Sequence, residues 1–448
     1  MADSAHAAGS AIHPWLTRLV QVEPHELRAL LWSFAYFFSL LCGYYIVRPM
    51  RDAMGIAGGV EQLQWLFTGT FVAMLAAVPV FGWVSSRFPR SRFLPYVYYF
   101  FIANLLIFYA LLRRQGSHVY AARAFFIWAS VYNLFVVSVF WSFMADLYTS
   151  PQAKRLFGFI AAGGTIGALV GPVLAASLGR SLGAANLLLL SAGFMGLAVL
   201  CIHRLIAWKA EQQGAASAEQ GVAETRPLGG GVVAAIPLVL RSPYLLGIAL
   251  FMMLFTTAST VLYFQQAQIV RDAVESSAER TAVFAAIDLA VNALTITIQV
   301  SLTGRLVRAL GIASALALIP VLLGLGFLAL GFAPVLAVIV AVQILRRAGD
   351  YAITRPAREM LYVVLGREEK YKAKNFVDTV VYRGGDAVSA WAYAGLRAMG
   401  LSLGAIAFVT VPVAGFWAWL AYRLGRSQEA LAARTMEGEA RWRPGAVH

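Results

Sequence analysis

YIVRPMRDA, residues 45–53, decides the fold, because its last three residues return as Arg271-Asp272-Ala273, 220 positions further along the chain. Two other pairs share this spacing: Ala153-Lys154 returns as Ala373-Lys374, and Gly164 returns as Gly384. The flanking sequence is mostly apolar. A repeat of this kind predicts two related bundles of membrane helices that face a shared cavity, the usual build of a secondary transporter.

The composition places the chain in a membrane. Hydrophobic residues make up 60% of it, charged residues 13%, and the mean hydropathy is +0.70. So few charges cannot cover the surface of a soluble protein of 448 residues. Cys42 and Cys201 lie in apolar runs and are interpreted as small buried side chains. The six histidines form no cluster with zinc-ligand spacing, so we expect neither a metal site nor a cofactor.

Twelve apolar runs are long enough to span a bilayer, because about 20 helical residues cross a hydrocarbon core about 30 Å thick. In the first half the predicted spans are Leu27 to Val47, Leu63 to Val84, Phe93 to Leu112, Val119 to Trp141, Leu156 to Leu178 and Ala184 to Cys201. In the second half they are Tyr244 to Phe264, Val283 to Leu302, Ile312 to Phe332, Val335 to Ile353, Phe376 to Leu396 and Leu403 to Tyr422. The predicted fold class is an all-α membrane protein with twelve transmembrane helices in two pseudo-symmetric six-helix bundles.

The predicted organisation has five parts. They are a cytoplasmic N-terminal segment (1–26), the first bundle (27–205), a cytoplasmic linker (206–240), the second bundle (241–424) and a cytoplasmic tail (425–448). Lys and Arg gather in the loops that face the cytoplasm when the N-terminus is inside. We therefore expect both termini in the cytoplasm; the further expectation of a bacterial inner membrane comes from the sequence resemblance described below. The same bias accounts for much of the net charge of +14 without a nucleic-acid partner.

Two stretches resemble the major facilitator superfamily. Residues 82–92, GWVSSRFPRSR, resemble the basic loop after the second helix of that superfamily, with Ser and Pro in place of its Asp and Gly. Gly163, Gly167 and Gly171 lie four residues apart on one helical face and precede Pro172, which resembles the Gly-Pro signature of the superfamily's antiporters. Glycines at this spacing more often form a close packing surface than exchange machinery.

A narrower resemblance covers nearly the whole chain. It is carried by residues 45–52 (YIVRPMRD), 356–360 (PAREM), 368–374 (EEKYKAK) and 378–386 (DTVVYRGGD). These runs resemble the ATP/ADP translocase family, the nucleotide exchangers of plastids and intracellular bacteria, and its bacterial relatives. The resemblance implies exchange of nucleotides, typically ATP for ADP with phosphate, by alternating access without hydrolysis.

Charged side chains within the membrane are costly, so they usually face a cavity or a partner. Helices 1, 4, 7 and 10 are expected to line the cavity of such a bundle, and cations predominate on them. The candidate substrate-binding residues are Arg48, Arg51, Tyr45, Arg123, Asn133, Gln265, Arg271, Arg346, Arg347 and Asp350. A guanidinium group binds phosphate through a fixed fork of donors, so an excess of arginine favours a phosphorylated anion.

The candidate gating or coupling residues are Asp52, Lys154, Asp272, Asp288, Lys374, Arg383 and Asp386. The repeat mates Lys154 and Lys374 fall at the inner ends of helices 5 and 11, where they would form matching gates. Asp288 is a lone buried acid in helix 8 and a candidate proton site. Some charges instead suit pairs within one helix, at three- or four-residue spacing: Arg48 with Asp52, Arg347 with Asp350, and Arg383 with Asp386.

Of the possible functions, the sequence favours transport. The chain has no G-x-x-x-x-G-K-[ST] phosphate loop and no soluble catalytic domain, so we expect neither an ATP-driven pump nor an enzyme. The leading hypothesis is a monomeric secondary exchanger of nucleotides or a similar phosphorylated anion, with nucleotide and phosphate as its partners. One alternative is a proton-coupled transporter of another organic anion or a drug, with Asp288 or Asp350 as coupling site. Another is a non-transporting membrane sensor or assembly factor.

Overall fold

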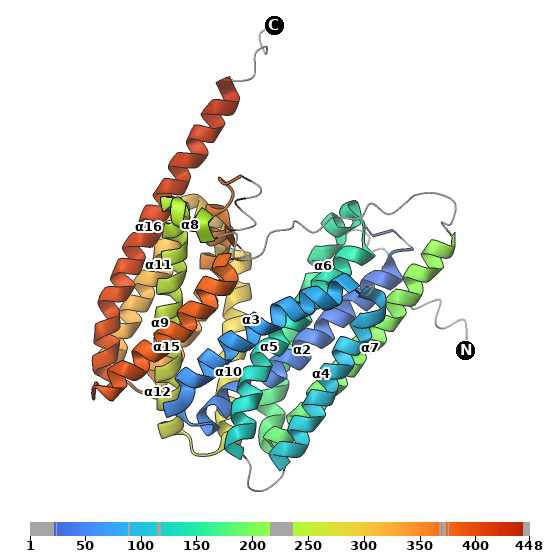
Figure 1. Cartoon of the computed structure of the whole chain (residues 1–448), viewed down its shortest axis with the longest axis horizontal. Helices are drawn as coiled ribbons and strands as arrows, with labels where there is room; N and C mark the ends of the chain where they lie inside the picture. The colour runs from blue at the N-terminus through green and yellow to red at the C-terminus, as the bar shows by residue number, and fades with distance from the viewer. Residues whose placement is uncertain are drawn as a thin grey trace. The chain divides into compact units, whose positions relative to one another are not determined.

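The computed structural model describes residues 22–23, 25–87, 90–113, 118–215, 236–366, 369, 373–374 and 376–441. All regular structure in these ranges is helical (Figure 1). Nearly all of the predicted N-terminal segment, most of the predicted linker and the end of the predicted tail lie outside the described residues. So do the side chains of the basic loop at 82–92.

Each of the twelve predicted spans falls on helical structure. The first half contains α2 (Leu27–Ala57), the short η1 (Val60–Gln62), α3 (Leu63–Arg87), α4 (Arg90–Arg113), α5 (His118–Leu147), α6 (Ser150–Leu182) and α7 (Ala184–Ala215). The second half contains α8 (Ile236–Arg241), α9 (Pro243–Ala273), α10 (Ser277–Ile298), η3 (Gln299–Thr303), α11 (Gly304–Phe332), α12 (Leu336–Gly349), η4 (Asp350–Thr354), α13 (Arg355–Leu361), η5 (Val377–Val381), α15 (Tyr382–Ala398) and α16 (Leu403–Arg441). Nine helices of the described chain are long and apolar enough to cross a membrane.

Irregular turns interrupt the helices of the second half. The elements η3, η4 and η5 are π-helical turns, and each continues directly into an α-helix. Gly311 breaks α11 with a φ of +73°, which glycine adopts without the steric cost of a Cβ atom. The predicted ninth span accordingly begins at Ile312, just after this break. Because π-turns often mark functional sites, η4 and η5 direct attention to the tenth and eleventh predicted spans, which include α12 and most of α15.

The helices form two compact units by their contacts. The first unit comprises Met1–Gly58, Val72–Ala223 and Ser276–Leu289, and the second comprises Gly59–Phe71, Glu224–Glu275 and Ala290–His448. The start of α10 therefore packs with the first unit and the start of α3 with the second. In the second unit, Trp391 of α15 donates through Nε1 to Thr68 of α3 at 3.0 Å, and its ring meets Trp65 edge-on.

The first unit is built around α2, which packs on α5, α6 and α7. Its core is aromatic: Phe37 stacks on Phe140 with ring centroids 4.2 Å apart, and Tyr36 meets the same ring edge-on. Buried hydroxyl groups find partners inside this core, since Ser33 and Tyr148 lie within hydrogen-bond distance at 2.9 Å. The pairing offsets the cost of burying these polar atoms and joins α2 to the residue that follows α5.

The glycines of α6 allow α2 to approach closely, which confirms the packing interpretation of their spacing. A methyl carbon built on Gly163 would lie 2.6 Å from the carbonyl oxygen of Phe34, and one on Gly171 would lie 2.7 Å from that of Cys42. At Gly167 the carbonyl oxygen of Phe38 is closer still. Backbone atoms cannot move aside as flexible side chains can. The three glycines therefore set the distance between these two helices.

Gly167→Ala is expected to destabilise the protein by about 1–3 kcal/mol, because the added methyl overpacks a backbone contact. Gly193→Ala on α7 is the matched control, since a methyl carbon added there would meet no heavy atom within 4 Å. That control should be neutral or stabilise by up to about 1 kcal/mol, because alanine restricts the unfolded chain more than glycine does. Thermal unfolding of both variants in detergent measures the difference, and equal shifts would contradict the packing role.

The second unit packs α16 tightly along α11 and α9. Gly404 of α16 lies against the carbonyl group of Gly331, and Gly425 lies against the backbone of Ala313. Trp417 completes this core between the rings of Phe251 and Phe255. With 39 residues, α16 is about 58 Å long at 1.5 Å per residue, roughly twice a hydrocarbon core. It continues past the other helices of its unit toward the C-terminus (Figure 1).

Candidate functional site

In the first unit, a buried ion pair joins α2 to α10. Arg48 donates through an Nη atom to Asp288 at 2.8 Å, and the Asp288 side chain is only 1% exposed. The prediction that Asp288 is a lone acid is therefore wrong, because folding brings it to an arginine 240 positions earlier in the chain. The mutual attraction of two charges at this distance offsets part of the cost of removing both from water.

Arg51 and Asp52 form a second polar group on α2. The Arg51 guanidinium donates to Ser130 of α5 at 3.0 Å and to Asp52 at 3.1 Å, and it stacks over the ring of Phe126 at 4.0 Å. Pro49, inside the helix between the two arginines, cannot donate to the carbonyl group of Tyr45. The geometry gives Arg51 three protein partners, which is the arrangement of a helix-to-helix tie.

Three other residues of the first unit were predicted to bind substrate: Arg123, Tyr45 and Asn133. Arg123 donates to the carbonyl oxygen of Gly58 at 2.8 Å and so closes the C-terminal end of α2. Tyr45 lies beside Arg48, whose guanidinium carbon is 5.7 Å from its ring centre. Asn133 on α5 is half-buried. The interactions of Arg123 thus point to a structural role rather than to contact with substrate.

In the second unit, Arg346 is the centre of a polar network between α12 and α9. Its guanidinium donates to Ser259 at 2.9 Å and to the Oε1 atom of Gln343 at 3.2 and 3.3 Å. Gln343 in turn donates to Gln266, so both ends of its amide are engaged. Within the described part of the chain, no carboxylate lies within ion-pair distance of Arg346. The network orients the guanidinium through neutral groups and leaves its charge uncompensated by direct contact.

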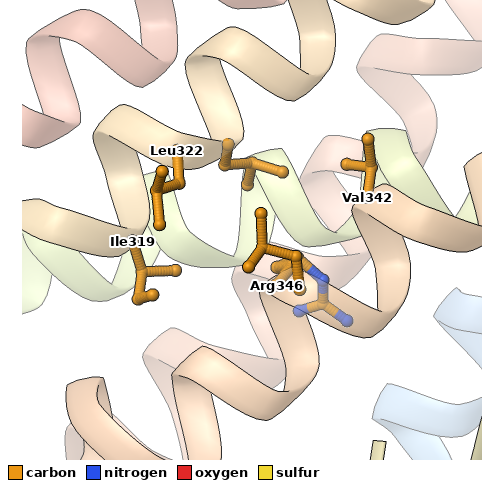
Figure 2. Close-up of a pocket in the computed structure, with 6 residues that line it drawn as sticks. Ile319, Leu322, Val342 and Arg346 are labelled. Carbon is orange, nitrogen blue, oxygen red and sulfur yellow. The ribbon is translucent and has the colours of Figure 1, made fainter. Parts of the chain in front are cut away.

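The apolar stem of Arg346 is held by an aliphatic recess. This narrow space is lined by Ile319, Leu322, Leu323, Val342, Leu345 and Arg346 itself. Figure 2 shows the guanidinium nitrogens pointing away from the aliphatic side chains. Packing of the stem restricts its rotamers, so the charged group is presented in one direction.

The π-turn η4 brings an unpredicted arginine into this region. Arg355 donates through Nε to Asp350 at 3.3 Å and lies over the ring of Tyr351 at 4.5 Å. The turn ends two residues before Pro356, whose ring would clash with the carbonyl group four residues earlier in a regular α-helix. Gln299 of η3 donates to the carbonyl oxygen of Tyr351 at 3.3 Å. The wider turn therefore aligns two residues, Asp350 and Arg355, that stand five apart.

The predicted pair of Arg383 and Asp386 is present on α15. Its N···O distance is 3.4 Å, and Asp386 also accepts a hydrogen bond from Thr260 of α9 at 3.2 Å. The Arg383 guanidinium lies 5.0 Å from the ring centre of Tyr382. This pair therefore ties α15 to α9 with the carboxylate shared between a cation and a hydroxyl group.

Two other predicted residues of the second unit, Gln265 and Arg347, are buried. Gln265 has no exposed surface and donates to the carbonyl oxygen of Leu403 at 3.0 Å, which joins α9 to the start of α16 and places it apart from the Arg346 network. Arg347 lies next to Arg346 in sequence but is 7% exposed. Consecutive helical residues point in different directions, and of the two it is Arg346 whose guanidinium donates to Ser259.

Two further predicted residues, Arg271 and Lys374, form ion pairs with acidic side chains. Arg271 pairs with Glu61 of η1 and with Asp272, whose side chain is 62% exposed. Lys374 pairs with Glu359, fifteen residues earlier in the chain. The side chain of Lys154 lies outside the described residues.

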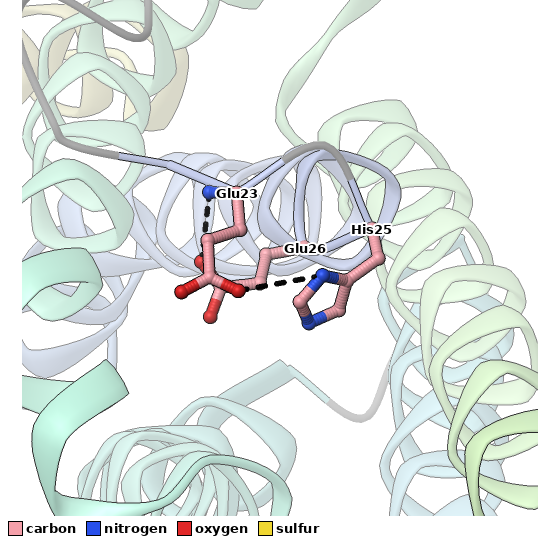
Figure 3. A group of neighbouring side chains, drawn as sticks. All are labelled: Glu23, His25 and Glu26. Atoms are coloured by element: carbon pink, nitrogen blue, oxygen red, sulfur yellow. Dashed lines mark hydrogen bonds and ion pairs between the residues drawn. The ribbon is translucent and has the colours of Figure 1, made fainter.

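A group of side chains at the start of α2 has the composition of a metal site. The ligand atoms of Glu23, His25 and Glu26 lie within 4.8 Å of one another (Figure 3). However, Glu26 is 1% exposed, and its oxygens accept from Arg155 at 3.0 and 3.2 Å and from Gln152 at 2.8 Å. These donors occupy the oxygens that a cation would need, so the group ties α2 to α6.

The stability of this tie should depend on pH. Burial alone would raise the pKa of the Glu26 carboxyl, but hydrogen bonds from the Glu23 amide, Gln152 and Arg155 outweigh it and lower the pKa below 4.5. A lowered folded-state pKa stabilises the fold above the unfolded value, and this contribution is lost as pH falls through the folded value. Glu26→Gln should therefore lower the melting temperature at pH 7 and reduce the acid sensitivity of unfolding below pH 4.5. A pH dependence identical to the parent would contradict this role.

The comparisons with known proteins agree with this architecture. A family model described as Major Facilitator Superfamily matches residues 30–352, more than half of the chain. The POT family transporter PepTSo is similar in structure, with a TM-score of 0.61 and 14% identity over 90% of this chain and 98% of that one. The nucleoside transporter NupG gives 0.58 and 14% over 91% and 99%. A bacterial homolog to the human lysosomal transporter Spinster gives 0.53 and 14% over the same shares. No curated protein matches the chain.

Proposed function

Because this chain belongs to the Major Facilitator Superfamily and is a secondary transporter of that kind, we propose that it exchanges nucleotides or a related phosphorylated anion by alternating access. Structural likeness at 12–14% identity reaches only the fold. The substrate class therefore rests on the residues of this chain and on the sequence runs that resemble the ATP/ADP translocases.

The observation that carries the proposal is the geometry of Arg346. A guanidinium inside a membrane protein needs a compensating charge, and the groups that hold this one are a hydroxyl and an amide. A phosphate group supplies the missing charge and matches the planar fork of donors. The polar contacts already made fix the direction of the side chain, so little entropy is lost when the anion binds.

Neighbouring cations increase the local positive charge. Arg347 and Arg355 lie within ten residues of Arg346, and the only acid in that segment is Asp350. Arg355 is 54% exposed despite its contact with Asp350, so it can exchange that contact for a substrate oxygen. A multiply charged anion such as a nucleoside diphosphate or triphosphate suits this excess better than a singly charged one.

The proposal includes a location. We place both termini in the cytoplasm, because the basic residues of the sequence concentrate on that side. We place the twelve helices in a bacterial inner membrane, because the sequence runs resemble a family with bacterial members. We also propose a monomer as the working unit, since a bundle of twelve helices can enclose its own path.

Transport into proteoliposomes tests the substrate. Vesicles containing the purified protein are loaded with ADP, with phosphate or with neither, and labelled ATP is added outside. Obligatory exchange gives uptake only with an internal counter-substrate. An absence of nucleotide uptake under every loading would overturn the nucleotide assignment and leave the fold assignment intact.

A second candidate function is proton-coupled transport of another organic anion, and the buried Arg48–Asp288 pair favours it. Protonation of Asp288 would neutralise the partner of Arg48 and weaken the contact between α2 and α10. Uptake that follows an imposed pH gradient and needs no internal counter-substrate would support this candidate over exchange.

A further inference from the structure

A groove lies between α9 and α16 in the second unit, apart from the Arg346 network. It has a volume of about 530 Å³. It is lined by Pro243, Tyr244, Gly247, Trp419, Leu420, Arg423, Leu424, Ser427, Ala430 and Leu431. Most of this lining is apolar, and Arg423 is the one side chain in it with a full charge. The groove thus combines a hydrocarbon-like wall with a single cation.

The position of the groove along the helices places it at a membrane surface. The apolar span of α9 starts at Pro243, and Gly247 packs against Leu424 of α16. The two helices run in opposite directions, so the first turns of α9 lie level with the C-terminal part of α16. The predicted twelfth span, Leu403 to Tyr422, has the roughly 20 residues that cross a hydrocarbon core, and it ends one residue before Arg423. On that prediction, Arg423 lies where hydrocarbon meets the headgroups.

Exposed aromatic side chains mark the same level on α16. Phe416 and Trp419 stack at 5.4 Å and are 45% and 52% exposed, and Tyr422 is 48% exposed. Aromatic residues with a polar edge concentrate at this depth of a bilayer because they contact both chains and headgroups. Trp419 belongs to the groove lining, so the groove opens toward lipid.

The charges around the groove favour an anion. The Arg423 guanidinium lies over the Trp419 ring at 5.1 Å and has no acidic partner among the described residues. Arg241 is exposed two residues before Pro243 and has no acidic partner in the same ranges. Arg426 differs, because it pairs with Glu429 at 3.6 Å. An anionic headgroup at this level would meet cations whose charge is not already compensated.

We propose that this groove binds one anionic phospholipid, with its phosphate on Arg423 and an acyl chain along Tyr244, Trp419 and Leu420. The planar fork of Arg423 takes the phosphate, and the apolar wall takes the chain. This lipid site is independent of the transported substrate, because none of its residues belongs to the Arg346 network. Its bound lipid joins α9 to α16 at the membrane surface.

Native mass spectrometry of the full-length protein in a neutral detergent tests the proposal. Phosphatidylglycerol and phosphatidylcholine with identical acyl chains are titrated separately. The protein is expected to bind phosphatidylglycerol roughly tenfold more tightly, which corresponds to one charge-assisted contact. Arg423→Gln should remove this preference and leave phosphatidylcholine binding unchanged. Arg426→Gln, on the same helix, should retain the preference because that arginine is already paired.

Two further measurements fix the location and the source of the phosphate. Ala430→Trp places an indole ring in the groove and should weaken binding of both lipids. Glycerol phosphate, a soluble headgroup, should not displace bound phosphatidylglycerol. Equal binding of the two lipids, a preference that survives Arg423→Gln, unchanged binding in Ala430→Trp, or displacement by glycerol phosphate would each overturn the proposal. Arg423 is exposed and Ala430 lines the open groove, so both variants should fold, and their melting temperatures without added lipid check this.

Discussion

Arg346→Ala is expected to weaken nucleotide binding by roughly 10- to 100-fold, because a charge-assisted contact to phosphate contributes about 1.5–3 kcal/mol. Arg346→Lys should recover only part of this loss, since an ammonium group keeps the charge but lacks the planar fork. Exchange in proteoliposomes should decline in the same order. The measurement is a titration of ATP and ADP against thermal stability, combined with initial uptake rates.

The matched control for this prediction is Arg397→Gln. Arg397 belongs to the same unit, is exposed and donates to the carbonyl oxygen of Leu401, three residues past the end of α15. It should leave binding and transport unchanged. The melting temperature of Arg346→Ala without nucleotide should stay near that of the parent, because the lost contacts are to neutral groups and a half-buried charge without a direct ion pair is removed with them. Normal nucleotide binding by Arg346→Ala would contradict the proposed phosphate contact.

Arg48→Gln is expected to destabilise the protein by about 3–5 kcal/mol, because it leaves the Asp288 carboxylate buried without its arginine. Asp288→Asn should be similarly harmful. The double variant should recover much of the loss, since two neutral amides can share a hydrogen bond without a buried charge. Unfolding of the four proteins in detergent gives the coupling energy of the pair directly.

Arg28→Gln provides the control for a pair that contributes little. Arg28 and Glu211 lie 3.7 Å apart with side chains 59% and 62% exposed, and such pairs contribute roughly 0–1 kcal/mol to stability. Arg28→Gln should therefore change the free energy of unfolding little.

Transport measurements separate the structural role of the Arg48–Asp288 pair from a role in proton coupling. If Asp288 carries a proton, the Asp288→Asn protein loses any dependence on a pH gradient. Additive single variants with no recovery in the double variant would contradict direct coupling.

The helices of this protein could be predicted from its sequence, because the thickness of the bilayer sets the length of the apolar segments that cross it. Each predicted span coincides with helical structure, and the glycine spacing at 163, 167 and 171 correctly indicated a close packing surface. The ends of the helices were harder to predict. The tail after Tyr422 continues as helix to Arg441, where polar residues replace the apolar signal.

The residues of the candidate site could be predicted only in part. Arg346 stood out because a charge within an apolar run is costly. Arg355 did not, because regular helices pair residues three or four apart, and its contact with Asp350 spans five through a π-turn. The proline at position 356 is the one local signal that could have indicated an irregular turn there.

The sequence by itself determined which segments form long apolar helices, because hydrophobicity is a local property of about 20 consecutive residues. It also determined which charges must be accommodated there. Only the tertiary structure decided which partner each charge found: Asp288 for Arg48, across 240 residues, and Ser259 and Gln343 for Arg346. A partner is selected by distance in space, and helices that pack together can be far apart along the chain.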